Sequence, residues 1–78
     1  MHHVLKIDEP FYHAVAEGRK TFEIRYDDRG YNAGDTVELY VPYTAFSHIR
    51  AKIGYVTSFK QQENYVVFSL LDVKVNKS

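Results

Sequence analysis

Residues 18–25 read Gly-Arg-Lys-Thr-Phe-Glu-Ile-Arg, and this stretch decides the predicted fold. Its second half alternates polar and apolar side chains, which is the pattern of a β-strand with one buried face. Successive side chains of a strand point to opposite faces, so Phe22 and Ile24 are expected in the core. Glu23 and Arg25 then share the other face, close enough to orient each other and a polar ligand.

A short helix is predicted directly before this strand, over residues 11–18. Asp8 can cap its N-terminus, and Glu9 and Pro10 are both favourable in a first turn. Gly18 ends the helix, because glycine adopts the left-handed conformation of that position without steric cost. The apolar side chains that recur at helical spacing are expected to lie across a barrel opening: Phe11, Ala14 and Val15.

Lys20, Glu23 and Arg25 form the best candidate site in the sequence. In an ideal strand Lys20 would point away from Glu23, so it joins the pair only from the turn that Gly18 allows before the strand. Groups of interacting charges often mark functional sites. The alternative is a solvated strand face with a surface ion pair, which contributes little to stability.

The spacing Gly18-x-Lys20-x-x-Glu23-x-Arg25 matches the Gly-x-Lys-x-x-Glu-x-Arg signature of ASCH domains, and the chain resembles these members of the PUA-like superfamily. The resemblance extends over residues 3–69. Further segments in the same order are similar to those of a small bacterial and phage branch of undefined function: His3-x-Leu5-Lys6-Ile7, the helix over 11–18, the loop at 27–29, Gly34-Asp35 and residues 65–67.

This resemblance implies a mostly β (α+β) fold, namely a PUA-like, partly open β-barrel with one main helix. It also implies a cleft between the helix and the barrel, lined by the signature residues. In that cleft Lys20 and Arg25 would donate to phosphate or base acceptors. Glu23 would accept from a base amino or imino group while holding Arg25 in place.

The remaining sequence predicts about five to six strands in a single domain, residues 1–78. A bend is expected at Gly54, and residues 76–78 are expected to fray. The predicted strands cover residues 4–7, 21–25, 36–41, 51–59 and 65–75. The predicted loops cover residues 26–34, 42–48 and 60–64. The expected core includes Phe22, Ile24, Val37, Leu39 and Phe68.

Composition and charge exclude several classes of function. The chain has no cysteine, so a disulfide framework, a thiolate zinc site and a cysteine nucleophile are excluded. It has neither a signal segment nor an apolar run near the ~18 residues of a membrane span, so we expect a cytoplasmic protein without a membrane partner. Ten Lys and Arg balance ten Asp and Glu. Any nucleic-acid site is therefore expected to be local, because sequence-blind binders carry a basic excess.

Other polar and aromatic residues are candidates for a supporting role. Arg19 and Arg29 could each add a phosphate contact at the rim of the site, although a solvated side chain is the simpler account. Tyr26, Tyr31 and Tyr43 fall in expected loops and could stack on an unpaired base.

The four histidines do not indicate a metal site. His13 and His48 lack the spacing that aligns two ligands on a helix, and His2 and His3 are expected to be solvated or structural. We expect neither a metal nor a cofactor. Ser47 is adjacent to His48, but no third orienting group supports a nucleophile–base pair.

The leading interpretation is a module that binds RNA or a nucleotide, including a modified one. One alternative is a hydrolase acting on a modified nucleoside, because ASCH relatives include an amidohydrolase of acetylated cytidine. Lys20 and Glu23 are then the catalytic candidates. In that branch a threonine stands where Glu23 stands here, so we expect a binding module rather than an enzyme. The other alternative is a protein-interaction module of a phage or mobile element.

Overall fold

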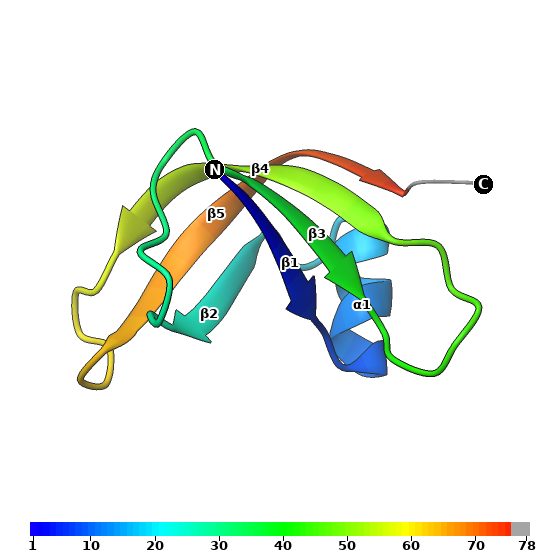
Figure 1. Ribbon diagram of the computed structural model, residues 1–78, viewed down its shortest axis with the longest axis horizontal. Coiled ribbons are helices and arrows are strands. Elements are labelled where there is room, and N and C mark those ends of the chain that lie inside the picture. Colours follow the sequence, from blue (N-terminus) through cyan, green and yellow to red (C-terminus); the bar gives the residue numbers. More distant parts are fainter. Residues whose placement is uncertain (76–78) are drawn as a thin grey trace.

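The computed structural model describes residues 1–75, and within them the chain forms five strands and one helix (Figure 1). In chain order the elements are β1 (His2–Lys6), α1 (Glu9–Ala16), β2 (Phe22–Tyr26), β3 (Thr36–Tyr40), β4 (Ile49–Thr57) and β5 (Tyr65–Val75). No helix in this range has the length and apolarity needed to cross a membrane. The frayed end expected at residues 76–78 lies outside the described residues.

All five strands belong to one curled sheet in the order β1-β3-β4-β5-β2. β1 pairs with β3 in parallel, and the other neighbours are antiparallel. The sheet curls until its two edge strands, β1 and β2, face each other without pairing (Figure 1). This confirms the predicted mostly β, partly open barrel with one helix. We call the open side between β1 and β2 the seam.

The connection between β1 and β2 is made by α1. Asp8 has the extended backbone of an N-cap residue, but its side chain makes no capping hydrogen bond, so that part of the prediction is wrong. Gly18 follows the helix with a φ of +79°, as predicted. The amide of Arg19 donates to the carbonyl of Ala14 at 2.9 Å, which closes the helix in a Schellman arrangement.

The face of α1 that packs on the sheet differs from the predicted stripe. Tyr12 and Val15 are its buried residues, and the Tyr12 hydroxyl donates to the carbonyl oxygen of Ser47 at 2.7 Å. This bond ties the helix to the loop between β3 and β4. Phe11, expected in the stripe, is 50% exposed because it lies on the seam side of the helix.

Side chains from α1 and from four of the strands fill the inside of the curled sheet. Val37, Leu39 and Phe68 are buried, as predicted. Removing such apolar area from water is the main term that stabilises a small domain. The largest fully buried side chains are Phe68, Leu39, Ile49, Ile53, Val15 and Val37.

The two faces of β2 are predicted the wrong way round. Phe22 and Ile24 are 42% and 51% exposed, whereas Glu23 is 3% exposed. The register shows the reason, because Glu23 lies opposite the buried Phe68 of β5, and Arg25 shares that inner face. β2 borders the seam, so its inward side chains meet polar groups there instead of a closed apolar core.

Strands β4 and β5 carry the predicted bend. β4 begins two residues earlier than predicted, and β5 has the predicted bounds. The pairing of the two strands shifts between Ile53 and Val56, on either side of Gly54. A Cβ atom at Gly54 would lie 2.8 Å from both Leu71 Cδ1 and Ser69 Oγ, so a larger residue here would require these two side chains to move.

Candidate functional site

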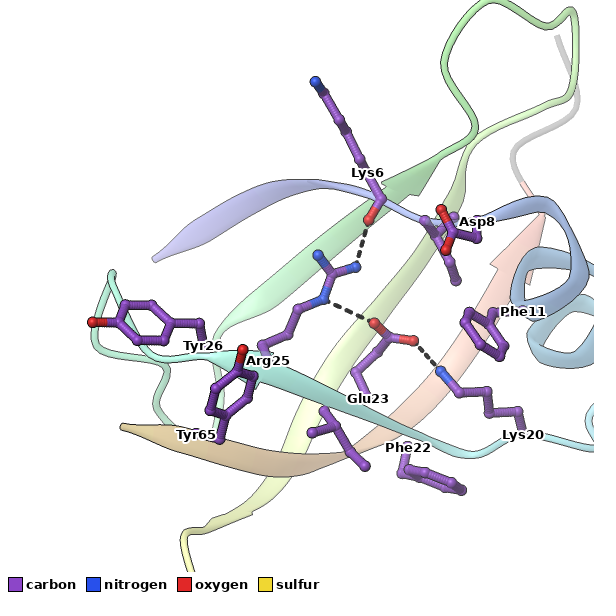
Figure 2. A pocket seen from close by; sticks show the side chains of 11 residues that line it. Lys6, Asp8, Phe11, Lys20, Phe22, Glu23, Arg25, Tyr26 and Tyr65 are labelled. Carbon is purple, nitrogen blue, oxygen red and sulfur yellow. Dashed lines mark hydrogen bonds and ion pairs between the residues drawn. The ribbon is translucent and has the colours of Figure 1, made fainter. Parts of the chain in front are cut away.

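A groove of about 540 Å³ runs along the seam. The end of β1 and the start of α1 form one side, and the outer edge of β2 forms the other (Figure 2). Its lining combines aromatic rings with charged side chains. The aromatic members include Phe11 and Tyr65, and the charged members include Lys6, Asp8, Lys20 and Arg25. Lys20, Glu23 and Arg25 of the signature therefore lie in one cleft between the helix and the barrel.

Glu23 lies at the centre of the groove and binds two cations (Figure 2). Lys20 Nζ donates to one carboxylate oxygen, and Arg25 Nε donates to the other at 2.9 Å. The Glu23 side chain is 5% exposed, while Lys20 and Arg25 are 18% and 22% exposed. One buried carboxylate thus fixes two partly exposed cations, and the cluster has a net charge of +1.

Lys20 reaches this cluster for the reason that the sequence predicts. Pairing of β2 begins only at Phe22, so Lys20 lies before the strand. Its side chain therefore need not follow the alternating directions of the strand side chains. The left-handed Gly18 reverses the chain after α1, and the Lys20 amide donates back to the Ala14 carbonyl at 3.0 Å. Glu23 and Arg25 share one strand face, as predicted.

Arginine side chains bridge the seam where main-chain pairing is missing. Arg25 Nη2 donates to the carbonyl oxygen of Lys6 at 2.6 Å, and Arg29 Nη1 donates to that of Val4 at 3.2 Å. Both carbonyls belong to β1, whose only strand partner within residues 1–75 is β3. The arginines therefore satisfy acceptors on the open edge of β1.

Several donors on the two cations remain open to the groove. An ammonium carries three N–H donors and a guanidinium carries five. Lys20 directs one donor to Glu23, and Arg25 directs one to Glu23 and one to Lys6. Every buried side-chain nitrogen and oxygen in the described chain has a partner, so Arg25 Nη1, which bonds no protein group, is accessible to solvent or to a ligand. The Lys20 side chain is 18% exposed, which leaves its other N–H donors for the same partners.

Aromatic rings flank the cations at both ends of the groove (Figure 2). Lys20 Nζ lies 5.1 Å from the ring centre of Phe11 and 5.4 Å from that of Phe22, within the range of cation–π attraction. At the other end Tyr26 and Tyr65 pack edge to face, with ring centres 5.6 Å apart. Tyr26 is 53% exposed, so its ring is available for stacking.

The other predicted supporting residues lie away from the groove lining. Arg19 is exposed and pairs with Glu17 at 2.9 Å. Arg29 bonds the Val4 carbonyl at the seam but is not part of the lining. Tyr31 is buried in the core, where burial raises the pKa of its hydroxyl. Tyr43 is fully exposed in the loop after β3.

Sequence reasoning missed the residues that complete the walls of the groove. The sequence predicts Phe22 and Ile24 in the core, Phe11 in the apolar stripe of the helix, and Tyr65 only in a strand. The signal that could have revealed Phe22 and Ile24 is the charge cluster itself, because a carboxylate that binds two cations on one strand face leaves Phe22 and Ile24 on the other. Lys6 contributes a main-chain carbonyl, which no side-chain pattern reveals.

A second buried polar cluster joins the start of β1 to the turn before β3. His3 Nε2 and Asp35 Oδ2 are 2.9 Å apart, and the Met1 amino group donates to Asp35 Oδ1 at 3.0 Å. The hydrogen bond with His3, and then that with the amino group, lowers the pKa of Asp35 from 3.8 to about 2. His3 is therefore structural, as expected for a histidine in this sequence.

His48 also has a structural partner. Its Nδ1 lies 2.7 Å from Glu38 Oε2, and this hydrogen bond lowers the pKa of Glu38. The carbonyl of the neighbouring Ser47 accepts the Tyr12 hydroxyl. Within residues 1–75, no group of three or more histidine, aspartate or glutamate side chains is arranged to hold a metal ion.

Comparison with known proteins places the chain in a family. None of the curated proteins compared with the chain matches it. One family matches residues 2–70, a span that includes α1, the seam and every residue that lines the groove. The chain belongs to this family, which is described as "Domain of unknown function (DUF3850)".

Proposed function

We propose that the protein binds RNA or a nucleotide in the seam groove. The observation that carries this proposal is the pair of cations fixed by one buried carboxylate, with donors left open between aromatic rings. Phosphate oxygens accept from such donors, and unpaired bases stack on exposed aromatic rings. The groove has the size of a small-ligand site and joins both kinds of group.

Each residue of the cluster has a separate part in this proposal. Lys20 and Arg25 bind the phosphate, and Tyr26 stacks on the base. The role of Glu23 differs from the expected one, in which it accepts a hydrogen bond from the base. Both of its oxygens already bind cations, and its side chain is nearly buried. Its part is to keep the two cations at a fixed separation, so that little side-chain freedom is lost on binding.

The resemblance to ASCH domains supports the same class of ligand and stays a prediction, since the matching family has no described activity. The neutral charge of the whole chain favours a short ligand over a long nucleic acid. A cytoplasmic location fits this ligand and is likewise part of the proposal.

The test is a titration of the ¹⁵N-labelled protein with nucleoside monophosphates and short single-stranded RNAs, followed by chemical-shift perturbation. We expect shifts confined to the groove and binding that weakens in Lys20→Ala and Arg25→Ala. Arg19→Ala is the matched control, because Arg19 is an exposed cation next to Lys20 but outside the groove. Unchanged spectra at millimolar ligand, or equal losses in all three variants, would reject the proposal.

A further inference from the structure

The outer edge of β2 presents main-chain groups that no strand covers. β2 is an edge strand whose single partner in the described chain is β5. Just outside the strand, the Leu70 amide donates to the Thr21 carbonyl at 2.9 Å, and the Asp27 amide donates to the Asn64 carbonyl at 2.8 Å. These bonds fix which residues of β2 face β5.

Hydrogen-bonded residues alternate along an antiparallel pair. Thr21 and Asp27 face β5, so Glu23 and Arg25 between them do too. The N–H and C=O groups of Phe22, Ile24 and Tyr26 then point to the opposite side. The Tyr26 carbonyl confirms this direction, because it accepts the Asp28 amide in the following turn.

Ile24 is the central residue of this free edge. It lies beside the groove, because Phe22, Ile24 and Tyr26 all belong to the groove lining. The facing edge of β1 is already occupied, because Arg25 and Arg29 bond its carbonyls. The free N–H and C=O of Ile24 are therefore a donor and an acceptor side by side, next to the cationic cluster.

We infer that the main-chain N–H and C=O of Ile24 bind the Watson–Crick edge of the nucleobase. This inference rests on the proposed function and adds how the base is recognised. Every nucleobase carries a donor beside an acceptor on that edge, for example the N3–H and O4 of uracil. A single residue of a strand edge offers the complementary acceptor and donor.

The structure favours a base over an extended peptide at this edge. Strand addition needs a continuous run of free main-chain groups and an open path beside them. Here the Arg25 side chain crosses the seam from β2 to the Lys6 carbonyl, within the length of the edge (Figure 2). A flat group that contacts one residue fits beside this bridge.

Recognition by one main-chain pair has two consequences for selectivity. It distinguishes a nucleotide from a sugar phosphate, which has no base. It also disfavours a base whose edge is blocked by a methyl group, because the methyl removes a donor and leaves the Ile24 carbonyl unpaired. Among the four ordinary bases it discriminates weakly, since each carries a donor–acceptor pair.

The probes are uridine 5′-monophosphate, 3-methyluridine 5′-monophosphate and ribose 5-phosphate, added to the ¹⁵N-labelled protein. In the free protein the Ile24 amide should exchange with solvent faster than the amides of Glu23 and Arg25, which face β5. We expect uridine monophosphate to slow Ile24 exchange and to bind about tenfold more tightly than the other two probes. Equal affinity for all three, with Ile24 exchange unchanged, would overturn the inference.

A variant tests the same group independently. Ile24→Pro removes the N–H from the free edge without breaking a bond to β5, which is the setting in which strands tolerate proline. Ile24→Ala is the control, because it shortens the side chain and keeps the N–H. We expect about tenfold weaker uridine monophosphate binding in Ile24→Pro than in Ile24→Ala. If Ile24→Pro does not fold, the exchange experiment decides.

The two proposals fail in different ways. If no phosphate-bearing probe binds, the proposed function is wrong and the inference falls with it. If the probes bind in a manner that needs Lys20 and Arg25 but ignores the base and Ile24, only the inference is wrong.

Discussion

The Arg25 guanidinium and the Lys6 carbonyl are joined by a 2.6 Å hydrogen bond across the seam, where β1 and β2 do not pair. The same guanidinium holds Glu23 through Nε. One side chain therefore connects the two edges of the sheet and positions the centre of the groove. Because the fold and the candidate site share Arg25, substitutions there should change both stability and binding.

The first prediction concerns the forked shape of Arg25. Arg25→Ala should cost about 3 to 5 kcal/mol of unfolding free energy, because it removes one of the two partners of a buried carboxylate. Arg25→Lys keeps the charge but cannot reach Glu23 and Lys6 at once, so it should cost about 1 to 3 kcal/mol. Urea denaturation measures both values. Wild-type stability of Arg25→Lys would show that the bridge to Lys6 contributes nothing.

The second prediction follows from the exposure of β2's apolar face. Phe22 is 42% exposed, so Phe22→Ala should cost only about 1 kcal/mol, below the usual loss for a core phenylalanine. Phe68→Ala is the matched comparison, because Phe68 is 1% exposed and its loss should cost about 3 to 5 kcal/mol. Equal losses in the two melting curves would mean that Phe22 is buried in solution.

This reversal shows how far the sequence determines the structure. Alternation correctly placed Glu23 and Arg25 on one face of a strand, and Gly18 correctly indicated a turn that brings Lys20 to them. Alternation divides side chains into two sets, however, and does not say which set points inward. Hydrophobicity normally decides that question, but here β2 borders an open seam where two cations satisfy the buried Glu23.

The opposite wall of the groove could not be predicted for a different reason. Lys6, Asp8 and Phe11 meet β2 only because the sheet curls and brings its edges together. Curl depends on the twist and pairing of all five strands and leaves no local pattern in the sequence. The Arg25 bond to a main-chain carbonyl is equally invisible, since every residue has a carbonyl.

The third prediction concerns stability in acid. The pKa of Asp35 is lowered from 3.8 to about 2 in the folded protein, so folding favours the charged form. The contribution of Asp35 to the free energy of unfolding is complete above the unfolded pKa of 3.8 and is lost as the pH falls through about 2. We expect the melting temperature to fall across this range.

Asp35→Asn isolates this contribution, because asparagine stays neutral at every pH. The variant should be less stable than the wild type at neutral pH, and the difference should narrow as the pH falls toward 2. Glu38→Gln is a useful companion, since the pKa of Glu38 is also lowered. A constant difference between wild type and Asp35→Asn at all pH values would contradict the assignment.

The fourth prediction concerns the dependence of RNA binding on salt. Two groove cations suggest about two phosphate contacts, and a single strand then gives a log–log slope of about −1.4. A third contact, from Arg29 after it leaves the Val4 carbonyl, would bring the slope to about −2.1. Fluorescence anisotropy of a short labelled RNA measures this slope. A value near −6 would require a broad basic surface outside the groove.

The last prediction concerns hydrolysis of acetylated cytidine, where we expect no turnover. Amide hydrolysis requires an unprotonated base or nucleophile and donors for the oxyanion. Of the two catalytic candidates, Glu23 binds a cation through each carboxylate oxygen, and Lys20 directs a donor to Glu23 while lying over the rings of Phe11 and Phe22. In these contacts Lys20 is a hydrogen-bond donor and a cation, and an ammonium has no lone pair with which to accept a proton.

Incubation of the protein with acetylated cytidine, followed by chromatography of cytidine, provides the measurement. A second carboxylate could assist hydrolysis, and Glu38 on β3 is a candidate. Glu38, however, binds His48 at 2.7 Å and Arg50 at 3.3 Å and is not part of the groove lining. Glu23→Thr introduces the threonine expected at this position in the amidohydrolase relatives of ASCH domains, and it removes the carboxylate partner of Lys20. Turnover in the wild type that disappears in Lys20→Ala would establish an enzyme in place of a binding module. Turnover in Glu23→Thr alone would show that Glu23 keeps Lys20 from acting as a base.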